Sequence, residues 1–245
     1  MKKNTSSSPK LSASAALIED LVAGSRILAK EGVLDGYGHI SARSDKRPEH
    51  FIMSRSRAPA LVSAADLMEL DPGSEPLGGD TRKGFIERYI HGEIYRKRPD
   101  VMAVVHSHSP SVIPFGVTKT KLRPIYHMGS FLWSGAPVWD IREVRRENDV
   151  LVRVRPLGKA LAGALGGCAC VLMRGHGMTV VGDGIQEVVF RAIYTEMNAR
   201  LQIQARQLDG PIEFLSEEEG KRSTAANRGT VERPWELWKM SVARK

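Results

Sequence analysis

Two short apolar runs, at residues 101–105 and 169–173, constrain the fold of this chain more than any other feature. Both are continuous and bounded by polar or turn-forming residues, which is typical of strands buried on both faces of a sheet. Longer stretches with apolar residues at helical spacing separate them, most clearly over residues 185–206. With only 6% aromatic residues and 23 glycines, the composition favours an α/β or α+β fold with many tight turns over a β-sandwich.

Local patterns predict the remaining elements. Further helices are expected over residues 12–29, 84–97 and 158–165, and further strands over residues 36–43 and 51–54. Ser63, followed three places later by Asp66, forms a capping-box pattern, which predicts a short helix that runs to about Leu70. Residues 71–82 are rich in Gly, Pro and Asp and are expected to form a loop.

These elements predict one folded domain over residues 12–209. Residues 1–11 are rich in Ser and Lys and are expected to form a disordered leader. Residues 210–245 are polar and irregular, and this C-terminal tail is expected to pack near an active site or a subunit interface. Trp235 and Trp238 either close the active-site pocket or anchor the tail on the sheet.

Part of the net charge of +8 lies at the two ends of the chain, and the sequence has no basic helix and no basic stripe interleaved with aromatic residues. A solvated surface that steers an anionic substrate therefore explains the charge better than nucleic-acid binding does.

Cys168 and Cys170 lie in an apolar run and are interpreted as buried small side chains rather than as metal ligands or a disulfide. The sequence lacks the apolar core of a signal peptide and the roughly 20 apolar residues of a membrane span, so we expect a cytoplasmic protein without a membrane partner.

Three of the seven histidines follow buried strands directly. His106 and His108 come after the strand at 101–105, and His176 comes after the strand at 169–173, between two glycines. In a His-x-His segment of extended chain, both side chains project to the same side and can reach one ion. Imidazole suits Zn²⁺, Mn²⁺ or Fe²⁺ better than Ca²⁺ or Mg²⁺, and three protein ligands with open positions are typical of a catalytic metal site. The sequence thus predicts a divalent transition-metal site.

Glu87, the segment 98–100, the segment 104–108 and the segment 174–177 together resemble the class II aldolase/adducin family. The resemblance runs over residues 17–206. It implies a three-layer α/β/α sandwich around a central, mostly antiparallel sheet, and a homotetramer with active sites near subunit interfaces. It also implies that the domain is catalytic and that the three histidines bind Zn or Mn, with Fe or Co as alternatives. Glu87 would be the catalytic acid/base and a further ligand when substrate is absent.

The chain departs from the sugar-phosphate aldolases of that family at the places where they bind phosphate. Their Gly-Asn motif, Ser-Gly pair and paired serines correspond here to Gly38-His39, to Ser54–Arg57 and to Phe85-Ile86. Phenylalanine and isoleucine offer no hydroxyl donor to a phosphate, whereas arginine suits a carboxylate, which it binds through paired hydrogen bonds. A phosphorylated sugar is therefore not the expected substrate.

Segments 87–95, 106–115 and 126–128 are similar to a branch of metal-dependent decarboxylases within the family, which act on hydroxylated aromatic or pyridine dicarboxylates such as dihydroxyphthalate-like compounds. The resemblance implies non-oxidative decarboxylation in aromatic compound catabolism, with the ion acting as a Lewis acid. The candidate catalytic residues are Glu87, His91 and His127, and the candidate substrate-binding residues are His39, Ser54, Arg55, Arg57 and Tyr126.

Other interpretations stay open at this point. His91 also fits a packed core histidine, and Arg55 and Arg57 also fit ordinary surface cations. The chain could instead be an aldolase for an unphosphorylated hydroxy-oxo acid, or a non-catalytic binding protein of the adducin kind. The presence of Glu87 together with the three histidines argues against the binding protein, because a scaffold does not need them.

Overall fold

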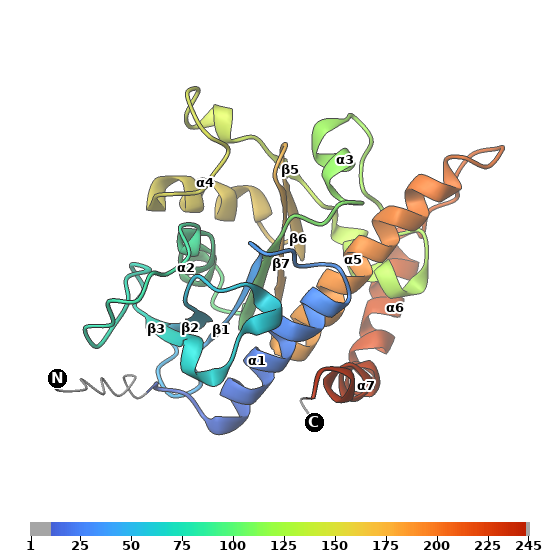
Figure 1. Cartoon of the computed structure of the whole chain (residues 1–245). Coiled ribbons are helices and arrows are strands. Elements are labelled where there is room, and N and C mark those ends of the chain that lie inside the picture. Colours follow the sequence, from blue (N-terminus) through green and yellow to red (C-terminus); the bar gives the residue numbers. More distant parts are fainter. Residues whose placement is uncertain (1–10, 244–245) are drawn as a thin grey trace, which may run out of the picture.

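The middle layer of the molecule is a single mixed sheet (Figure 1). The strands are β1 (His39–Arg43), β2 (Phe51–Ser54), β3 (Leu67–Leu70), β4 (Ala103–Ser107), β5 (Val138–Trp139), β6 (Cys170–Met173) and β7 (Gly177–Gly182). Within residues 11–243, the part of the chain that this computed structural model describes, they form a seven-stranded sheet in the order β3-β2-β1-β4-β7-β6-β5. Neighbouring strands are antiparallel except β5 and β6, which are parallel. The predicted mostly antiparallel sheet is confirmed.

Helices cover both faces of this sheet (Figure 1). The helices are α1 (Ala15–Lys30), α2 (Arg88–Lys97), α3 (Ile113–Val117), α4 (Arg155–Leu165), α5 (Ile185–Ala205), α6 (Glu217–Arg228) and α7 (Glu232–Val242), with short 3₁₀ turns η1 (Pro59–Leu61), η2 (Ala64–Asp66), η3 (His127–Ser134) and η4 (Ile141–Glu143). Successive strand residues point to opposite faces. Ala103 and Val105 of β4 accordingly pack in the core with α1 and α5, whereas Val104 packs in the core with α2 and α4. The three-layer α/β/α sandwich is therefore confirmed.

The edge strand β3 corrects one prediction. Ser63 and Asp66 do form the predicted capping box, but the helix is the single 3₁₀ turn η2, and the chain continues as β3 instead of as a helix to Leu70. Leu67 is buried in one core and Met68 in the other. In a strand that pairs with β2, successive side chains point to opposite faces and can enter both cores. A helix would bury only one of its faces.

The C-terminal residues are helical rather than irregular. Ser216 and Glu219 form a capping box at the start of α6, a signature that the sequence carries. Trp235 and Trp238 on α7 are buried in the core that contains α1 and α5, and the Trp238 ring lies 6.3 Å from the ring of Tyr194 on α5. They therefore anchor the tail on the helix layer instead of directly on the sheet.

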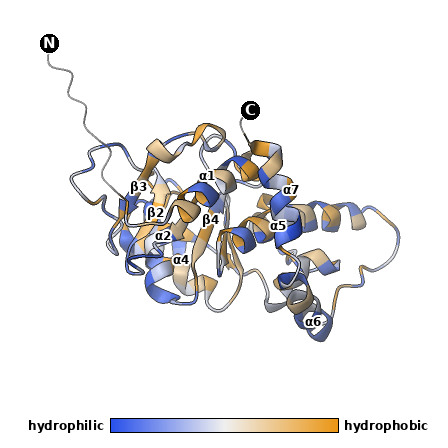
Figure 2. Ribbon diagram, turned by 90° about the horizontal axis from the view of Figure 1, so that it is seen from below, coloured by the Kyte–Doolittle hydropathy of each residue, from blue (hydrophilic) through white to orange (hydrophobic). Residues whose placement is uncertain are grey.

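The hydropathy of the elements follows this layering. In Figure 2 the apolar colour gathers in the strands, while α6 is mainly polar. None of the helices within residues 11–243 is long and apolar enough to cross a membrane. Of the predicted leader, residues 1–10 lie outside the described part of the chain, and Leu11 packs partly buried against the core.

The close packing of α2 against α4 leads to a first prediction. A Cβ atom at Gly158 on α4 would meet the backbone oxygen of Tyr89 at 2.4 Å, whereas one at Gly163 on the same helix would meet only Lys97 Nζ, at 3.7 Å. We expect Gly158→Ala to lower the free energy of unfolding by about 1–3 kcal/mol, because backbone cannot move aside cheaply. Gly163→Ala should raise it by about 0.5–1 kcal/mol through helix propensity. Urea unfolding of both variants measures this, and equal stabilities would contradict the tight helix contact.

Candidate metal centre

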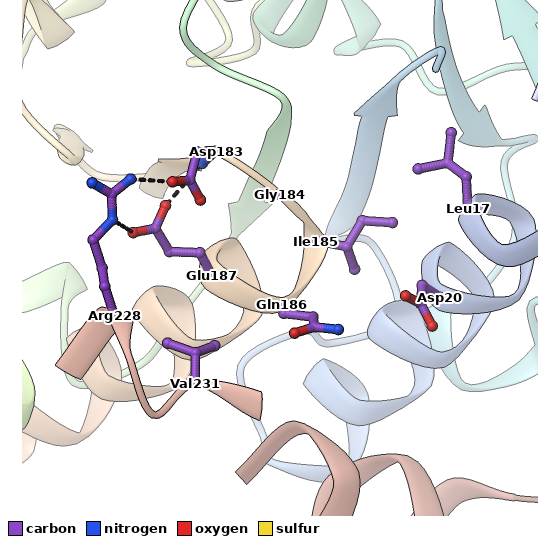
Figure 3. Close-up of a pocket in the computed structure, with 9 residues that line it drawn as sticks. All are labelled: Leu17, Asp20, Asp183, Gly184, Ile185, Gln186, Glu187, Arg228 and Val231. Atoms are coloured by element: carbon purple, nitrogen blue, oxygen red, sulfur yellow. Dashed lines mark hydrogen bonds and ion pairs between the residues drawn. The ribbon is translucent and has the colours of Figure 1, made fainter. Parts of the chain in front are cut away.

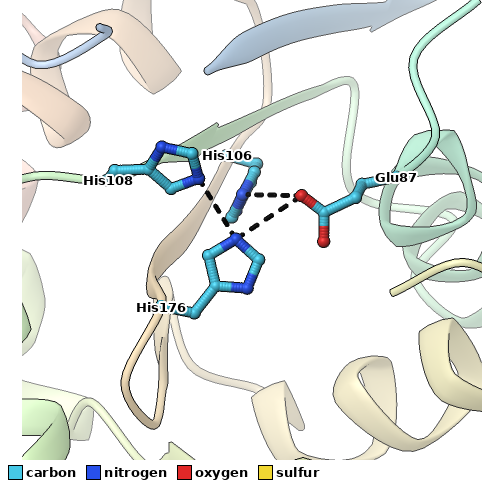
Figure 4. A group of neighbouring side chains, drawn as sticks. All are labelled: Glu87, His106, His108 and His176. Atoms are coloured by element: carbon cyan, nitrogen blue, oxygen red, sulfur yellow. Dashed lines mark hydrogen bonds and ion pairs between the residues drawn. The ribbon is translucent and has the colours of Figure 1, made fainter. Parts of the chain in front are cut away.

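Four side chains from separate parts of the sequence converge at the ends of β4 and of the β6–β7 hairpin (Figure 4). His106 lies in β4 and His108 just after it, His176 lies in the turn between β6 and β7, and Glu87 immediately precedes α2. The register of β4 against β7, with His106 opposite Thr179, brings the strand end beside that turn. One nitrogen or oxygen atom from each of the four residues lies within 4.8 Å of the others.

The atoms that face one another are the Nε2 atoms of the histidines and one carboxylate oxygen. Glu87 Oε2 lies 3.5 Å from His106 Nε2 and 3.4 Å from His176 Nε2, and His176 Nε2 lies 3.1 Å from His108 Nε2. His106 Nε2 is buried and has no hydrogen-bond partner within residues 11–243. A buried ring nitrogen that points into a group of donor atoms is the arrangement expected of a metal ligand.

The other nitrogen of each histidine is held by an oxygen. His106 Nδ1 donates to the backbone oxygen of Met178 at 3.1 Å, and His108 Nδ1 donates to Asp35 Oδ2 at 2.9 Å. His176 Nδ1 donates to the backbone oxygen of Val150 at 2.8 Å. Because Nδ1 carries the hydrogen in each ring, the Nε2 lone pair is free to bind a metal. The residues present therefore fit a divalent transition ion with three imidazole ligands and one carboxylate.

The electrostatics of the cluster favour positive charge where the four groups meet. Burial acts to raise the pKa of Glu87, but the neighbouring His106 and His176 hold it far below its ordinary value. Burial lowers the pKa of His106 against the attraction of Glu87. In His176 the balance is reversed: burial is outweighed by Glu87 and by the backbone of Val150, and its pKa is raised. Glu87 is thus ionised and favours a cation beside it.

One loop positions two of these residues through its backbone. The carbonyl of Val150 accepts from His176, and the N–H of Val152 donates to Glu87 Oε1 at 2.8 Å. Val150 has φ 59, a left-handed conformation that is rare for a β-branched residue. The Asn148 side chain holds this conformation: its Oδ1 accepts from Val150 N at 3.0 Å and its Nδ2 donates to two preceding carbonyls. Strain of this kind persists only where the surroundings impose it, and here the strained residue is the one whose carbonyl accepts from His176.

Two further histidines lie beside the cluster. His39 of β1 is paired across the sheet with His106, and their rings are 5.2 Å apart. His39 Nδ1 is 2.7 Å from Nε2 of His91, which is fully buried on α2. The ring of Phe85 lies 4.5 Å from that of His39. The structure therefore brings His39 next to the candidate metal ligands and places His91 behind it.

The arginines of the segment 54–57 differ in their surroundings. Arg55 Nε donates to Asp66 Oδ1 at 2.7 Å, so its charge is already paired. Arg57 Nε is buried and has no hydrogen-bond partner within the described residues. Ser54, at the end of β2, is buried opposite Leu67.

Tyr126 and His127 are not brought to the cluster within one chain. The Tyr126 ring lies 6.5 Å from that of Tyr194 on α5, and its hydroxyl is buried without a partner among residues 11–243. His127 is exposed at the start of η3, and its backbone oxygen accepts from Asn227 of α6. Both belong to the surface formed by η3, α5 and α6.

Sequence reasoning missed three contributors to the centre: Asp35, Asn148 and the backbone of Val150. Asp35 had a recognisable signal, because its Oδ1 accepts from the backbone N–H groups of Tyr37 and Gly38 in a turn that Asp-Gly sequences favour. Nothing local indicates that its other oxygen binds His108. Asn148 and Val150 lie in an irregular loop, where contacts with Glu87 and His176 depend entirely on the tertiary fold.

A separate cavity of about 430 Å³ lies between α1, the start of α5 and α6 (Figure 3). Its polar wall is an ion-pair network in which Arg228 of α6 binds both Asp183 and Glu187. Leu17 of α1 and Val231 form part of the apolar wall. None of the four candidate metal ligands lines it. The network fastens α6 to the start of α5. A structural role therefore accounts for these charged residues.

Comparison with known proteins agrees with this fold. The chain matches the family described as Class II Aldolase and Adducin N-terminal domain over residues 19–203. It is 39% identical to the Decarboxylase tropJ of Talaromyces stipitatus, over 92% of this chain and 93% of that protein. It is 34% identical to a 3,4-dihydroxyphthalate decarboxylase of Terrabacter, over 78% and 84% of the two chains. The solved L-fuculose 1-phosphate aldolase of Glaciozyma antarctica superposes with a TM-score of 0.76 at 22% identity, over 93% of this chain and 88% of that one.

The chain therefore belongs to the class II aldolase/adducin family, and its curated relatives include the decarboxylases of that family. The resemblance seen in the sequence is confirmed. The aldolase structure supports the fold alone.

The ligand set leads to a second prediction. His106→Ala and His176→Ala should each lose a tightly bound divalent ion that the unchanged protein holds in about equal stoichiometry, because catalytic sites of this type use three protein ligands. Elemental analysis after dialysis against a weak chelator measures the content. His50→Ala, at a histidine bonded to Glu69 outside the cluster, is the matched control and should keep the ion. Metal retained by both cluster variants would contradict the assignment.

The loop that holds Val150 leads to a third prediction. Asn148→Ala should weaken binding of Mn²⁺ or Zn²⁺ by about 10-fold, because groups that orient a ligand typically contribute about 10–100-fold to metal affinity. Competition with a chromophoric chelator measures the affinity. Asn227→Ala also removes a side-chain amide that binds backbone, but on the η3–α6 side, and should leave metal affinity unchanged. Equal affinity in the two variants would show that the loop does not position the ligands.

Proposed function

We propose that this protein is a metal-dependent lyase that decarboxylates a hydroxylated aromatic or heteroaromatic dicarboxylate without an oxidant. The observation that carries the proposal is the similarity to a decarboxylase along nearly the whole of both chains. The convergence of Glu87, His106, His108 and His176 supports it, because loss of CO₂ from a hydroxyaromatic acid leaves negative charge that a cation stabilises.

The surroundings of the cluster suit an aromatic carboxylate. Phe85 is buried against His39 in the place where the sugar-phosphate aldolases carry serine hydroxyls. A flat apolar side chain favours contact with an aromatic ring and disfavours a phosphate. Arg57 has a buried, unpaired Nε and is the better of the two arginines for a substrate carboxylate, since Arg55 is neutralised by Asp66.

A divalent ion at the cluster, Mn or Zn in this proposal, would supply Lewis-acid stabilisation of the charge that develops on the substrate oxygens. His106, His108 and His176 would hold it through Nε2, with Glu87 as a further ligand when substrate is absent. The hydrogen bond from Val152 N–H to Glu87 Oε1 keeps Oε2 directed into the site.

Glu87 moves the proton in this mechanism. Its Oε2, ionised at the start, accepts the proton of the substrate hydroxyl and delivers it to the neighbouring ring carbon that bears the carboxylate. The bond from that carbon to the carboxylate then breaks, CO₂ leaves, and the electron pair restores the aromatic ring as a phenolate. A proton from solvent neutralises the phenolate, so one proton replaces one CO₂.

Assembly into a homotetramer belongs to the same proposal. Tyr126 and His127, the remaining candidates for substrate binding and proton transfer, lie on the surface formed by η3, α5 and α6 and have no contact with the cluster of their own chain. They would reach a site only across a subunit interface. His127 is exposed, so a neighbouring subunit can contact it.

The proposal leads to a fourth prediction. The Mn²⁺- or Zn²⁺-loaded protein should release CO₂ from 3,4-dihydroxyphthalate or a related ortho-hydroxy aromatic dicarboxylate, measured by coupled assay and product chromatography. Glu87→Gln should lower kcat by about 10²–10⁴-fold, because it removes the proton-transfer group. Glu217→Gln, on the exposed face of α6, is the matched control and should keep full activity.

Other results would select other functions. A carbonyl fragment released from an unphosphorylated hydroxy-oxo acid, without CO₂, would identify an aldolase. Absence of a bound ion together with absence of turnover would favour a non-catalytic binding protein. Normal turnover in Glu87→Gln would move the proton transfer to another group.

A further inference from the structure

A chain of hydrogen-bonded side chains runs behind the cluster between β1 and α2. Tyr95 OH is 2.7 Å from Ser41 Oγ, Ser41 Oγ is 2.6 Å from His91 Nδ1, and His91 Nε2 is 2.7 Å from His39 Nδ1. His39 and Ser41 are two residues apart on a strand and so share a face, and His91 and Tyr95 are four apart on a helix and so share a face. All four side chains are buried, and the mechanism above uses none of them.

The hydrogen bonds that link these four side chains can run in only one direction without leaving a hydroxyl unsatisfied. If Tyr95 donates to Ser41, then Ser41 donates to His91 Nδ1, and His91 Nε2–H donates to His39 Nδ1. In the opposite direction the Tyr95 hydroxyl would need another acceptor, and the described residues provide none for it. An unsatisfied buried hydroxyl costs about 1–3 kcal/mol, which is enough to select the first direction.

Both histidines enter this chain as neutral rings. Burial lowers the pKa of His91 to about 3, and His39 is neutral because its Nδ1 accepts the hydrogen of His91 Nε2. A neutral imidazole carries one hydrogen, so a His39 that accepts at Nδ1 must carry its hydrogen on Nε2. Nε2 of His39 has no protein partner within residues 11–243, and His39 keeps a small exposed surface of 3%.

We propose that Tyr95, Ser41 and His91 are positioning residues that lock His39 as a hydrogen-bond donor toward a carboxylate oxygen of the substrate. This inference rests on the proposed function, because it names the group that recognises the carboxylate beside the metal centre. His39 lies 5.2 Å from His106, ring to ring, and Phe85 supports its other side. A donor without charge selects an oxygen acceptor there and rejects an amide N–H or an ammonium group, which would leave two donors facing each other.

The tautomer can be measured without any substrate. In the full-length protein with ¹⁵N-labelled histidine, long-range ¹H–¹⁵N spectra distinguish Nδ1–H from Nε2–H rings, and His39→Gln and His91→Gln assign the two signals. We expect Nε2–H for His39 and for His91. An Nδ1–H signal from His39 would overturn the inference while leaving decarboxylation intact.

Recognition is tested with phthalate, an inert dicarboxylate, by calorimetry on the metal-loaded protein. Ser41→Ala should weaken phthalate binding by about fivefold, because only molecules that retain the donor tautomer bind well, and His39→Phe should weaken it by about tenfold or more. Ser25→Ala removes a buried serine hydroxyl on α1 far from the cluster and is the matched control, with unchanged binding. Metal content should be unchanged in all three variants.

The two proposals fail in different ways. Phthalate binding that is equal in the unchanged protein, Ser41→Ala and His39→Phe, or absent from all of them, overturns the assignment of His39 as the carboxylate donor. Absence of CO₂ release from a protein that binds metal and phthalate and shows the expected tautomer overturns the decarboxylase assignment alone.

Discussion

The pairing of β4 with β1 on one side and β7 on the other is the constraint on which the candidate site depends. His39, His106 and Thr179 lie in one row across these strands, so His39 and His106 project from the same face of the sheet. A register shift of one residue would turn His106 to the opposite face. Val104 and Val105 of β4 are buried in different cores, so the strand is covered on both faces.

The same packing makes it feasible to bury a carboxylate and several imidazoles together. Glu87 would be costly to bury alone, yet Val152 N–H satisfies one oxygen and the histidines surround the other. The Nδ1 atoms of the three cluster histidines are held by oxygens, so the rings cannot rotate away from the centre. The fold thus holds together several nitrogen and oxygen lone pairs that would repel one another without a positive charge between them.

The sequence predicted the parts of this structure that short-range patterns determine. The two apolar runs appeared as β4 and β6. Both strands pair antiparallel with β7, which lies between them, so their C-terminal ends point the same way and bring His106, His108 and His176 together. Residues 67–70 were assigned to a helix because a capping box precedes them, and only pairing with β2 explains the strand. The strand β7 and the helix α7 were not predicted, since their stability comes from contacts with distant elements. The helix α6 was not predicted either, although the capping box of Ser216 and Glu219 is a local signal for it. The interaction of Asp35 with His108 has no sequence signal, and neither do the loop contacts of Glu87 and His176.

The loop around Val150 holds Glu87 and His176 through an N–H and a carbonyl, groups that every residue except proline possesses. The side chains of residues 150–152 make neither contact themselves, although Val152 is fully buried in the core and so must stay apolar. The length of the loop is not free in this way, because the two contacts are only two residues apart and face different ligands. A single-residue insertion or deletion there would displace both at once. An apolar substitution at position 152 would consequently leave both contacts in place, whereas a change in the number of loop residues would remove both.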